Sequence, residues 1–108
     1  MGSSPDGLIR ELRGFRRKLA RRYPVERMIL FGSRARGEAH RFSDVDLLVV
    51  SAKFHRRNAV DRAYPLRLEW DLDYPVDFLC YTPEEFRRLS RRGGIVREAL
   101  REGKVVSE

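Results

Sequence analysis

Two aspartates and a glycine–serine pair are the residues of this chain whose types and spacing could do chemistry. Gly32-Ser33 is followed, after ten further residues, by Asp44 and Asp46. The aspartates open an apolar run at 47–50, and the glycine–serine pair ends another, so both groups stand at the end of a candidate strand. A small-residue turn can hold phosphate, and paired carboxylates can hold a divalent cation. The pattern therefore predicts metal-assisted chemistry on a phosphate compound.

The two aspartates are expected to share a metal site because side chains alternate along a strand. Asp44 and Asp46 would point to the same face with Cα atoms about 6.5 Å apart, close enough for both carboxylates to reach one site. Two like charges at the mouth of a buried strand repel each other and resist desolvation, and a bound cation removes both costs. Oxygen-only ligands favour Mg²⁺ or Mn²⁺ over zinc. The alternative is that the aspartates merely end a loop.

The glycine–serine pair is interpreted as a phosphate-holding turn after a strand predicted over 25–31. Glycine permits a sharp turn and a close approach of phosphate, and Ser33 could cap a short helix beginning over 34–36. Arg34 and Arg36 could add charge-assisted hydrogen bonds to a triphosphate, with a solvated face as the alternative for both. Alone, the pair would fit an ordinary strand-to-helix turn. The P-loop pattern is absent from the sequence.

A third carboxylate is predicted at Asp77, inside a strand expected over 76–81. An acidic residue within an otherwise apolar strand is unusual, and a role as a further metal ligand would explain it. Asp71 and Asp73 are the alternatives, but they lie in a more polar stretch that favours a solvated turn.

This combination of a Gly-Ser-x10-Asp-x-Asp element and a later strand carboxylate resembles the DNA polymerase β-type nucleotidyltransferase superfamily. The short chain and the wording Phe-Gly-Ser-Arg-Ala-Arg-Gly of residues 31–37 are most similar to the minimal nucleotidyltransferases. Members of that group include antitoxins encoded beside HEPN-domain ribonuclease toxins. The resemblance covers about residues 25–81. It implies an α/β (α+β) nucleotidyltransferase fold, with a small mixed β-sheet flanked by helices.

The resemblance also implies a reaction and a role for each residue of the motif. AMP would move from a nucleoside triphosphate, ATP, to an acceptor hydroxyl, and pyrophosphate would leave with the help of two Mg²⁺ ions, or Mn²⁺ in their place. By that resemblance the catalytic and metal-binding residues are Asp44, Asp46 and Asp77, and the nucleotide-binding residues are Gly32, Ser33, Arg34 and Arg36.

The acceptor implied by the resemblance is a tyrosine of a HEPN-type toxin, which would make this chain the antitoxin of a toxin–antitoxin pair. Relatives that act on nucleic acids or drugs carry further segments for the acceptor, whereas this chain is expected to hold little beyond the catalytic core. The acceptor site would then be minimal, shared across a homo-oligomer or supplied by a partner. Two other functions stay open: a module that neutralises a toxin mainly by covering it, and a nucleotidyltransferase acting on a small molecule.

Length and composition favour one nucleotidyltransferase domain over residues 1–108, located in the cytoplasm. No apolar run approaches the roughly 20 residues that a membrane helix needs, so no membrane association is expected. The net charge of +7, with twenty arginines and three lysines, favours polyanionic partners such as triphosphates, RNA or an acidic protein. Direct nucleic-acid binding is not expected, because no recognised nucleic-acid module accompanies the charge.

Hydrophobic spacing predicts four helices around the strands that must position these residues. The first carries an apolar stripe that would pack on the sheet, and the second would be kinked or split by Pro65. The predicted boundaries are Ser4-Pro5 and Pro24 for the first helix, about 56 and 70 for the second, Thr82-Pro83 for the start of the third, and Gly93-Gly94 for the break before the fourth, with Val105-Val106 as a short final strand or a frayed end.

Overall fold

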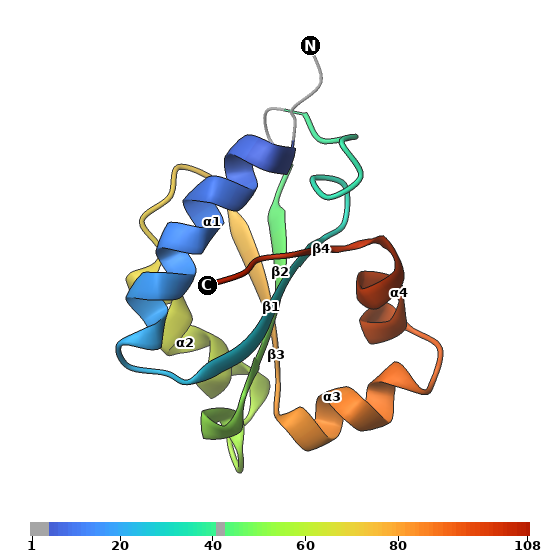
Figure 1. Cartoon of the computed structure of the whole chain (residues 1–108). Coiled ribbons are helices and arrows are strands. Elements are labelled where there is room, and N and C mark those ends of the chain that lie inside the picture. Colours follow the sequence, from blue (N-terminus) through green and yellow to red (C-terminus); the bar gives the residue numbers. More distant parts are fainter. Residues whose placement is uncertain (1–4, 41–42) are drawn as a thin grey trace.

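The computed structural model describes residues 5–40 and 43–108, and in it a four-stranded sheet lies between two helical layers (Figure 1). The strand order is β3-β2-β1-β4, with β2 parallel to β3 and antiparallel to β1. The elements are α1 (Pro5–Ala20), β1 (Val25–Phe31), β2 (Val45–Ser51), the short 3₁₀ helix η1 (Ala52–Phe54), α2 (Ala59–Glu69), β3 (Val76–Tyr81), α3 (Pro83–Ser90), α4 (Ile95–Glu102) and β4 (Lys104–Val105).

The mixed sheet with helices on both faces confirms the predicted fold class. β1 and β3 occupy the predicted ranges, and the break between α3 and α4 falls at the predicted glycine pair. β2 begins one residue later than expected, so Asp44 precedes the strand instead of lying in it. The predicted helix start at Ser4 lies outside the described residues. Within the two described ranges, no helix is long and apolar enough to cross a membrane.

The second helix differs from its prediction at both its start and its proline. α2 begins at Ala59, not near 56, because the side chain of Asn58 accepts a hydrogen bond from the N–H of Asp61 (2.8 Å) and caps the helix there. Arg56, with φ 63°, lies in the left-handed region and cannot continue a helix. Pro65 lies inside α2 without splitting it.

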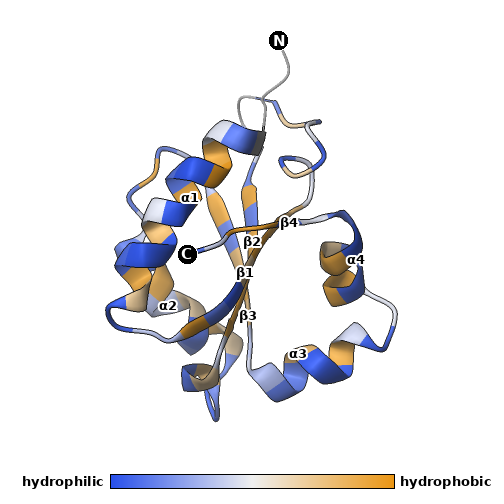
Figure 2. Cartoon of the chain, viewed as in Figure 1, coloured by the Kyte–Doolittle hydropathy of each residue, from blue (hydrophilic) through white to orange (hydrophobic). Residues whose placement is uncertain are grey.

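The sheet is covered on both faces, which explains the unbroken apolar run of β2 (Figure 2). Leu47 and Val49 join the core that α1 and α2 build on one face. Leu48 and Val50 join the core that α3 and α4 build on the other. Because β2 packs on both sides, the residues at its amino end are held in a fixed place.

Two arginines of α2 cover the outer edge of β3, the edge strand of the sheet. Arg67 Nη1 donates to the carbonyl of Val76 (3.3 Å), and Arg62 Nη1 donates to the carbonyl of Cys80 (3.0 Å). Edge carbonyls that already have donors are poor templates for pairing with another chain. α2 therefore packs on the core and seals the sheet.

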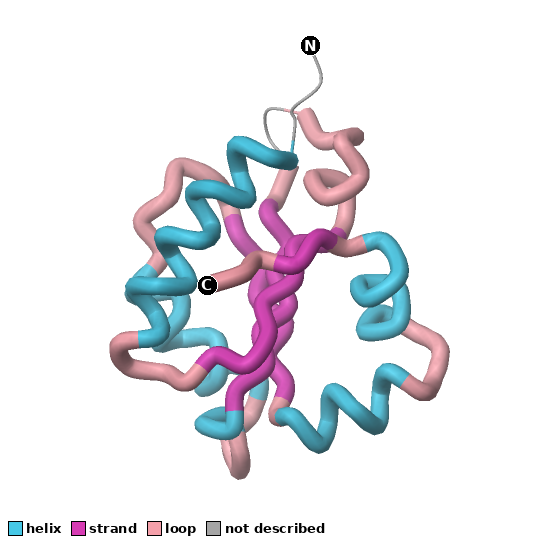
Figure 3. Tube along the Cα trace, in the orientation of Figure 1, coloured by secondary structure: helices cyan, strands magenta, loops and turns pink. Residues whose placement is uncertain are grey.

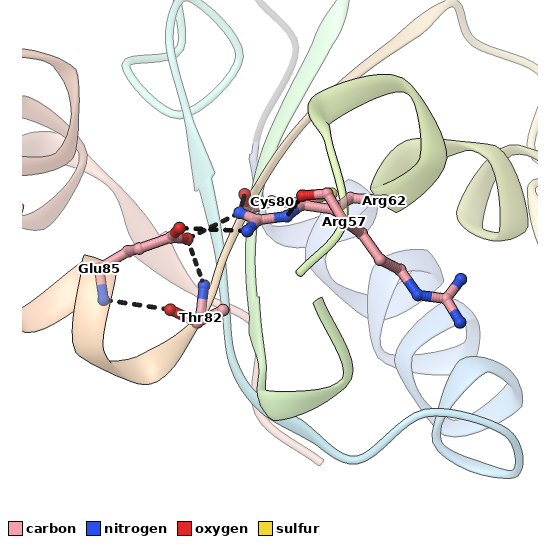
Figure 4. A network of polar contacts seen from close by, with 5 residues as sticks. All are labelled: Arg57, Arg62, Cys80, Thr82 and Glu85. Atoms are coloured by element: carbon pink, nitrogen blue, oxygen red, sulfur yellow. Dashed lines mark hydrogen bonds and ion pairs between the residues drawn. The ribbon is translucent and has the colours of Figure 1, made fainter. Parts of the chain in front are cut away.

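A polar network joins α2, β3 and α3 (Figure 4). Arg62 donates to both carboxylate oxygens of Glu85, at 2.7 and 3.1 Å. Glu85 also accepts from the N–H of Thr82 (2.9 Å), while the Thr82 hydroxyl accepts from the N–H of Glu85 (3.2 Å). This capping box confirms the predicted helix start at Thr82-Pro83. The hydrogen bond from Arg62, with those from Thr82, lowers the pKa of Glu85 to about 2.

Glu85→Gln is expected to lower the free energy of unfolding by about 1 kcal/mol at pH 7, through loss of the ion pair and of part of the cap. Because the folded-state pKa of Glu85 lies below its ordinary value of 4.5, its stabilising contribution is present above that pH and is lost as the pH falls toward about 2. Urea unfolding at pH 7 and pH 3 should show the cost of the substitution shrinking in acid. Glu84→Gln, at an exposed position of the same turn, is the control. Equal costs for the two variants would contradict the assignment.

Candidate active site

The motif residues meet at one end of the sheet, where β1 ends and β2 and β3 begin (Figure 1). Phe31, the last residue of β1, is paired with Asp46, and Asp46 is paired with Asp77 of the parallel strand β3. Lateral neighbours in a sheet point to the same face, so these two aspartates project side by side. Gly32 follows β1 directly. Strand register alone thus brings the turn and two carboxylates together.

Gly32 lies directly against the carboxylate of Asp46. A Cβ added at Gly32 would overlap the Oδ2 atom of Asp46, and the backbone there has φ +75°, in the left-handed region. Both features require glycine. This residue therefore fixes how closely the turn approaches the carboxylate.

The segment after Gly32 forms turns (Figure 3), not the predicted short helix over 34–36. The N–H groups of Ala35 and Arg36 both donate to the carbonyl of Gly32, at 3.1 and 3.3 Å. Within residues 5–40 and 43–108, the N–H groups of Ser33 and Arg34 donate to no backbone carbonyl. Successive backbone N–H groups beside a left-handed residue are suited to an anion. The turn can therefore offer amide donors to a phosphate.

Asp46 is a half-buried carboxylate among like charges. Burial raises its pKa above the ordinary value, and the charges of Asp77 and Asp44 raise it further, while Arg36 acts in the opposite direction. Asp44 and Asp77 are exposed. Among the residues that the structure describes, no three Asp, Glu, His or Cys side chains gather closely enough to hold a metal ion as they stand. The three predicted carboxylates are thus electrostatic neighbours but not a closed ligand cage.

Asp77 lies at the solvent-facing side of this end of the sheet. Its side chain is 62% exposed, and its Oδ1 atom lies 4.0 Å from Nη2 of Arg67 in α2. Asp71, one of the two alternatives for the third carboxylate, forms an ion pair with Lys18 of α1 at 3.3 Å. Of these two, only Asp77 is paired in register with Asp46.

Arg34 is buried, and its guanidinium makes its contacts inside the chain. Nε and Nη2 donate to the carbonyl of Ser43 at 3.1 and 2.8 Å, and Nη2 lies 3.4 Å from the carbonyl of His40. The same group lies 4.7 Å from the ring centroid of Tyr74. Arg34 therefore ties the turn to the backbone that precedes Asp44. Sequence reasoning missed this role, because no local pattern marks an arginine whose partners are carbonyls and a distant ring.

Tyr74 extends the same brace to α1. Its hydroxyl donates to Glu11 (3.1 Å), and its carbonyl accepts from the indole N–H of Trp70 (2.9 Å). Burial, followed by the hydrogen bond to Glu11, raises the pKa of Tyr74. Arg34 and Tyr74 thus hold the segments before β2 and β3 against each other.

Arg36, in contrast, lies at the surface of the site. Its guanidinium contacts Glu38 at 2.7 Å and Glu102 of α4 at 3.5 Å. The hydrogen bond to Glu38 is the main cause that raises the pKa of Arg36. Since Arg36 also lowers the pKa of Asp46, its charge is felt at the carboxylates. It is therefore a cation placed where the phosphates of a ligand would lie beside Asp46.

The sequence is similar to known nucleotidyltransferases. A family model described as a nucleotidyltransferase domain matches residues 12–106. A probable protein adenylyltransferase, MntA, from Haemophilus influenzae is 38% identical over 68 residues, which make up 61% of this chain and 60% of that protein. The match therefore spans less than two thirds of the relative's length.

Solved structures share the fold. A structure from Sulfolobus solfataricus, assigned as a nucleotidyltransferase, has a TM-score of 0.66 at 22% identity, covering 94% of this chain and 80% of that one. A structure assigned as a minimal nucleotidyltransferase has a TM-score of 0.58 at 31% identity, covering 94% and 95%. A chain from a toxin–antitoxin structure with AMP-PNP has a TM-score of 0.59 at 26% identity, covering 88% and 72%.

Proposed function

Because this chain belongs to the nucleotidyltransferase domain family, we propose that it transfers AMP from ATP to a hydroxyl group of a partner protein. The observation that carries the proposal is the meeting of Gly32, Asp46 and Asp77 at one end of the sheet, from three neighbouring strands. A phosphate-holding turn against a pair of neighbouring carboxylates is what phosphoryl chemistry with divalent cations requires.

The carboxylates fit a divalent cation by their chemistry. Asp44, Asp46 and Asp77 offer oxygen donors only, which suits Mg²⁺ or Mn²⁺. Asp46 is held half-buried among like charges, a cost that a cation would remove. When bound, the cations would supply positive charge for the triphosphate and for the leaving pyrophosphate. Asp77, exposed at the solvent side, is placed to accept the proton of an incoming hydroxyl.

The turn after β1 is proposed to hold the triphosphate. The N–H groups of Ser33 and Arg34 would donate to phosphate oxygens, and Gly32 would let the phosphates approach Asp46. Arg36 would exchange its contact with Glu38 or Glu102 for a charged phosphate oxygen. The side chain of Arg34, predicted to bind the nucleotide, would instead orient the turn from behind.

The proposed acceptor is a tyrosine of a HEPN-type toxin, so the chain would act as an antitoxin in the cytoplasm. Two descriptions of similar proteins support this choice: a protein adenylyltransferase, and a toxin–antitoxin structure with AMP-PNP. Tyrosine modification would block the toxin by adding a bulky, charged group to a neutral side chain.

Co-expression with the product of the adjacent gene, followed by incubation with α-labelled ATP and Mg²⁺, tests the proposal. We expect the label on a tyrosine of that protein, found by mass spectrometry of its peptides, and complete loss of labelling when EDTA removes the cations. Heat-treated chain is the control for unspecific labelling. Neutralisation of the toxin without any label would favour a steric antitoxin and contradict the enzyme.

A further inference from the structure

Three large apolar side chains stand exposed in one row on α2. Val60, Tyr64 and Leu68 are 75%, 61% and 68% exposed and follow one another at four-residue intervals, so they line one face of the helix. The opposite face carries Ala63 and Leu66, which are buried in the core. Isolated apolar residues are ordinary on a protein surface, but a continuous row marks a contact surface. We call Val60, Tyr64 and Leu68 the α2 row.

Cations border the α2 row at both ends. Leu68 forms a wall of a hollow of about 210 Å³ together with Lys53 and Arg22. At the other end, Arg57 precedes Val60 by three residues, and its guanidinium points away from the polar network (Figure 4). The row is therefore an apolar strip with a positively charged rim, which is the usual arrangement of a protein-binding surface.

The α2 row also adjoins the candidate active site. Arg67 stands next to Leu68 in α2, and it reaches both the carbonyl of Val76 and the carboxylate of Asp77. The exposed side of α2 thus borders the solvent side of Asp77. A protein seated on the row would have its surface beside the carboxylate at which the acceptor hydroxyl is proposed to react.

We propose that the α2 row is the docking surface for the acceptor protein, and that its occupant is an acidic amphipathic helix of that protein. This inference rests on the proposed function, which requires a protein acceptor. An apolar face on such a helix would cover the row, with Tyr64 as the central anchor, and its acidic flanks would meet Lys53 and Arg57.

A second copy of this chain is a poorer occupant on grounds of charge and area. Each copy carries a net charge of +7, so self-association would bring two basic rims together. The row exposes only a few hundred Å² of apolar surface, against about 800 Å² per partner in a standard interface. An acidic partner can extend the contact over the basic rim, whereas a second copy cannot.

The double variant Tyr64→Ser/Leu68→Ser tests the proposal with the adjacent gene product as the probe. We expect its affinity for that protein, measured by calorimetry, to fall at least about 30-fold, because apolar anchors dominate such contacts. The affinity for ATP and the melting temperature should stay unchanged. Ile95→Ser/Leu100→Ser, which removes two exposed apolar side chains from α4, is the matched control and should bind normally.

Charge supplies a second arm of the test. Lys53→Glu/Arg57→Glu should slow association with the acidic partner about tenfold at low salt, and the effect should fade as salt is raised. An unchanged association rate would overturn the choice of an acidic occupant. A photo-crosslinker at position 64 that captures a second copy of this chain would overturn the heterologous partner.

The outcomes separate this inference from the proposed function. Transfer of AMP that is equal in wild type and Tyr64→Ser/Leu68→Ser would overturn the docking surface and leave the enzyme standing. Binding through the row without any transfer would support the surface and remove the enzyme. A wild-type chain that neither binds nor modifies the adjacent gene product would overturn both.

Discussion

Asp46→Asn should abolish AMP transfer, with a loss of at least about 1,000-fold in rate, while the protein stays folded. Asp46 is the central carboxylate of the site, because it is paired with Asp77 in the sheet and lies against Gly32. Asparagine keeps the size of the side chain but offers a cation only one neutral oxygen. Single-turnover transfer from ATP measures the loss. Asp73→Asn, at the exposed alternative carboxylate, should keep its activity.

The same substitution should leave stability unchanged or raise it when no divalent cation is present. Burial and the charges of Asp77 and Asp44 raise the pKa of Asp46, so its ionised form is disfavoured in the folded state. A group of this kind favours folding below its unfolded-state pKa, and that contribution is lost as the pH rises through the folded-state pKa. Asparagine removes the charge and therefore the cost at pH 7.

Thermal unfolding with and without Mg²⁺ checks this second effect. Mg²⁺ should raise the melting temperature of the wild type, because a cation that binds only the folded state stabilises it. It should leave Asp46→Asn almost unchanged. A variant that unfolds, or that gains as much from Mg²⁺ as the wild type, would remove Asp46 from the cation site.

Gly32→Ala and Gly37→Ala are expected to differ widely, although both place a side chain on left-handed backbone. The φ angles are 75° and 74°, so the backbone strain is nearly equal, at about 1 kcal/mol. The added Cβ meets the carboxylate of Asp46 at Gly32 and nothing within 4 Å at Gly37. The difference between the variants therefore isolates the contact with Asp46.

We expect Gly37→Ala to lose about 1 kcal/mol of stability and to keep most of its activity. Gly32→Ala should lose at least about 3 kcal/mol, or else displace Asp46, and in either case transfer should fall at least about 100-fold. Urea unfolding and transfer rates measure the two effects. If both variants behave alike, the close approach of the turn to Asp46 is not important for catalysis.

The strands were the most predictable part of the fold. The ranges 25–31 and 76–81 are apolar runs bounded by turn residues, and the start of α3 at Thr82-Pro83 depends on a cap that is purely local. The start of α2 was predicted wrongly, because helical composition continues back to 56 while Arg56 adopts a left-handed conformation. Nothing in the local sequence marks that change of direction.

The candidate site was predictable to the extent that strand register builds it. Asp46 and Asp77 are 31 positions apart in the sequence, yet neighbouring strands pair them directly. Arg34 could not be interpreted correctly, because its partners include the ring of Tyr74, forty positions away. The binding roles of the motif residues stay predictions that the substitutions above will test.

The two arginines that reach across from α2 to β3 bind together properties that other proteins keep separate. Arg62 and Arg67 occupy the carbonyls of an outer strand, and Arg67 also lies against a carboxylate of the proposed site. Any adjustment of α2 that widened access for a bulky substrate would also strip donors from that strand. Selection for a broader range of acceptors would therefore expose the protein to strand-by-strand polymerisation, and solubility would limit how far its specificity could drift.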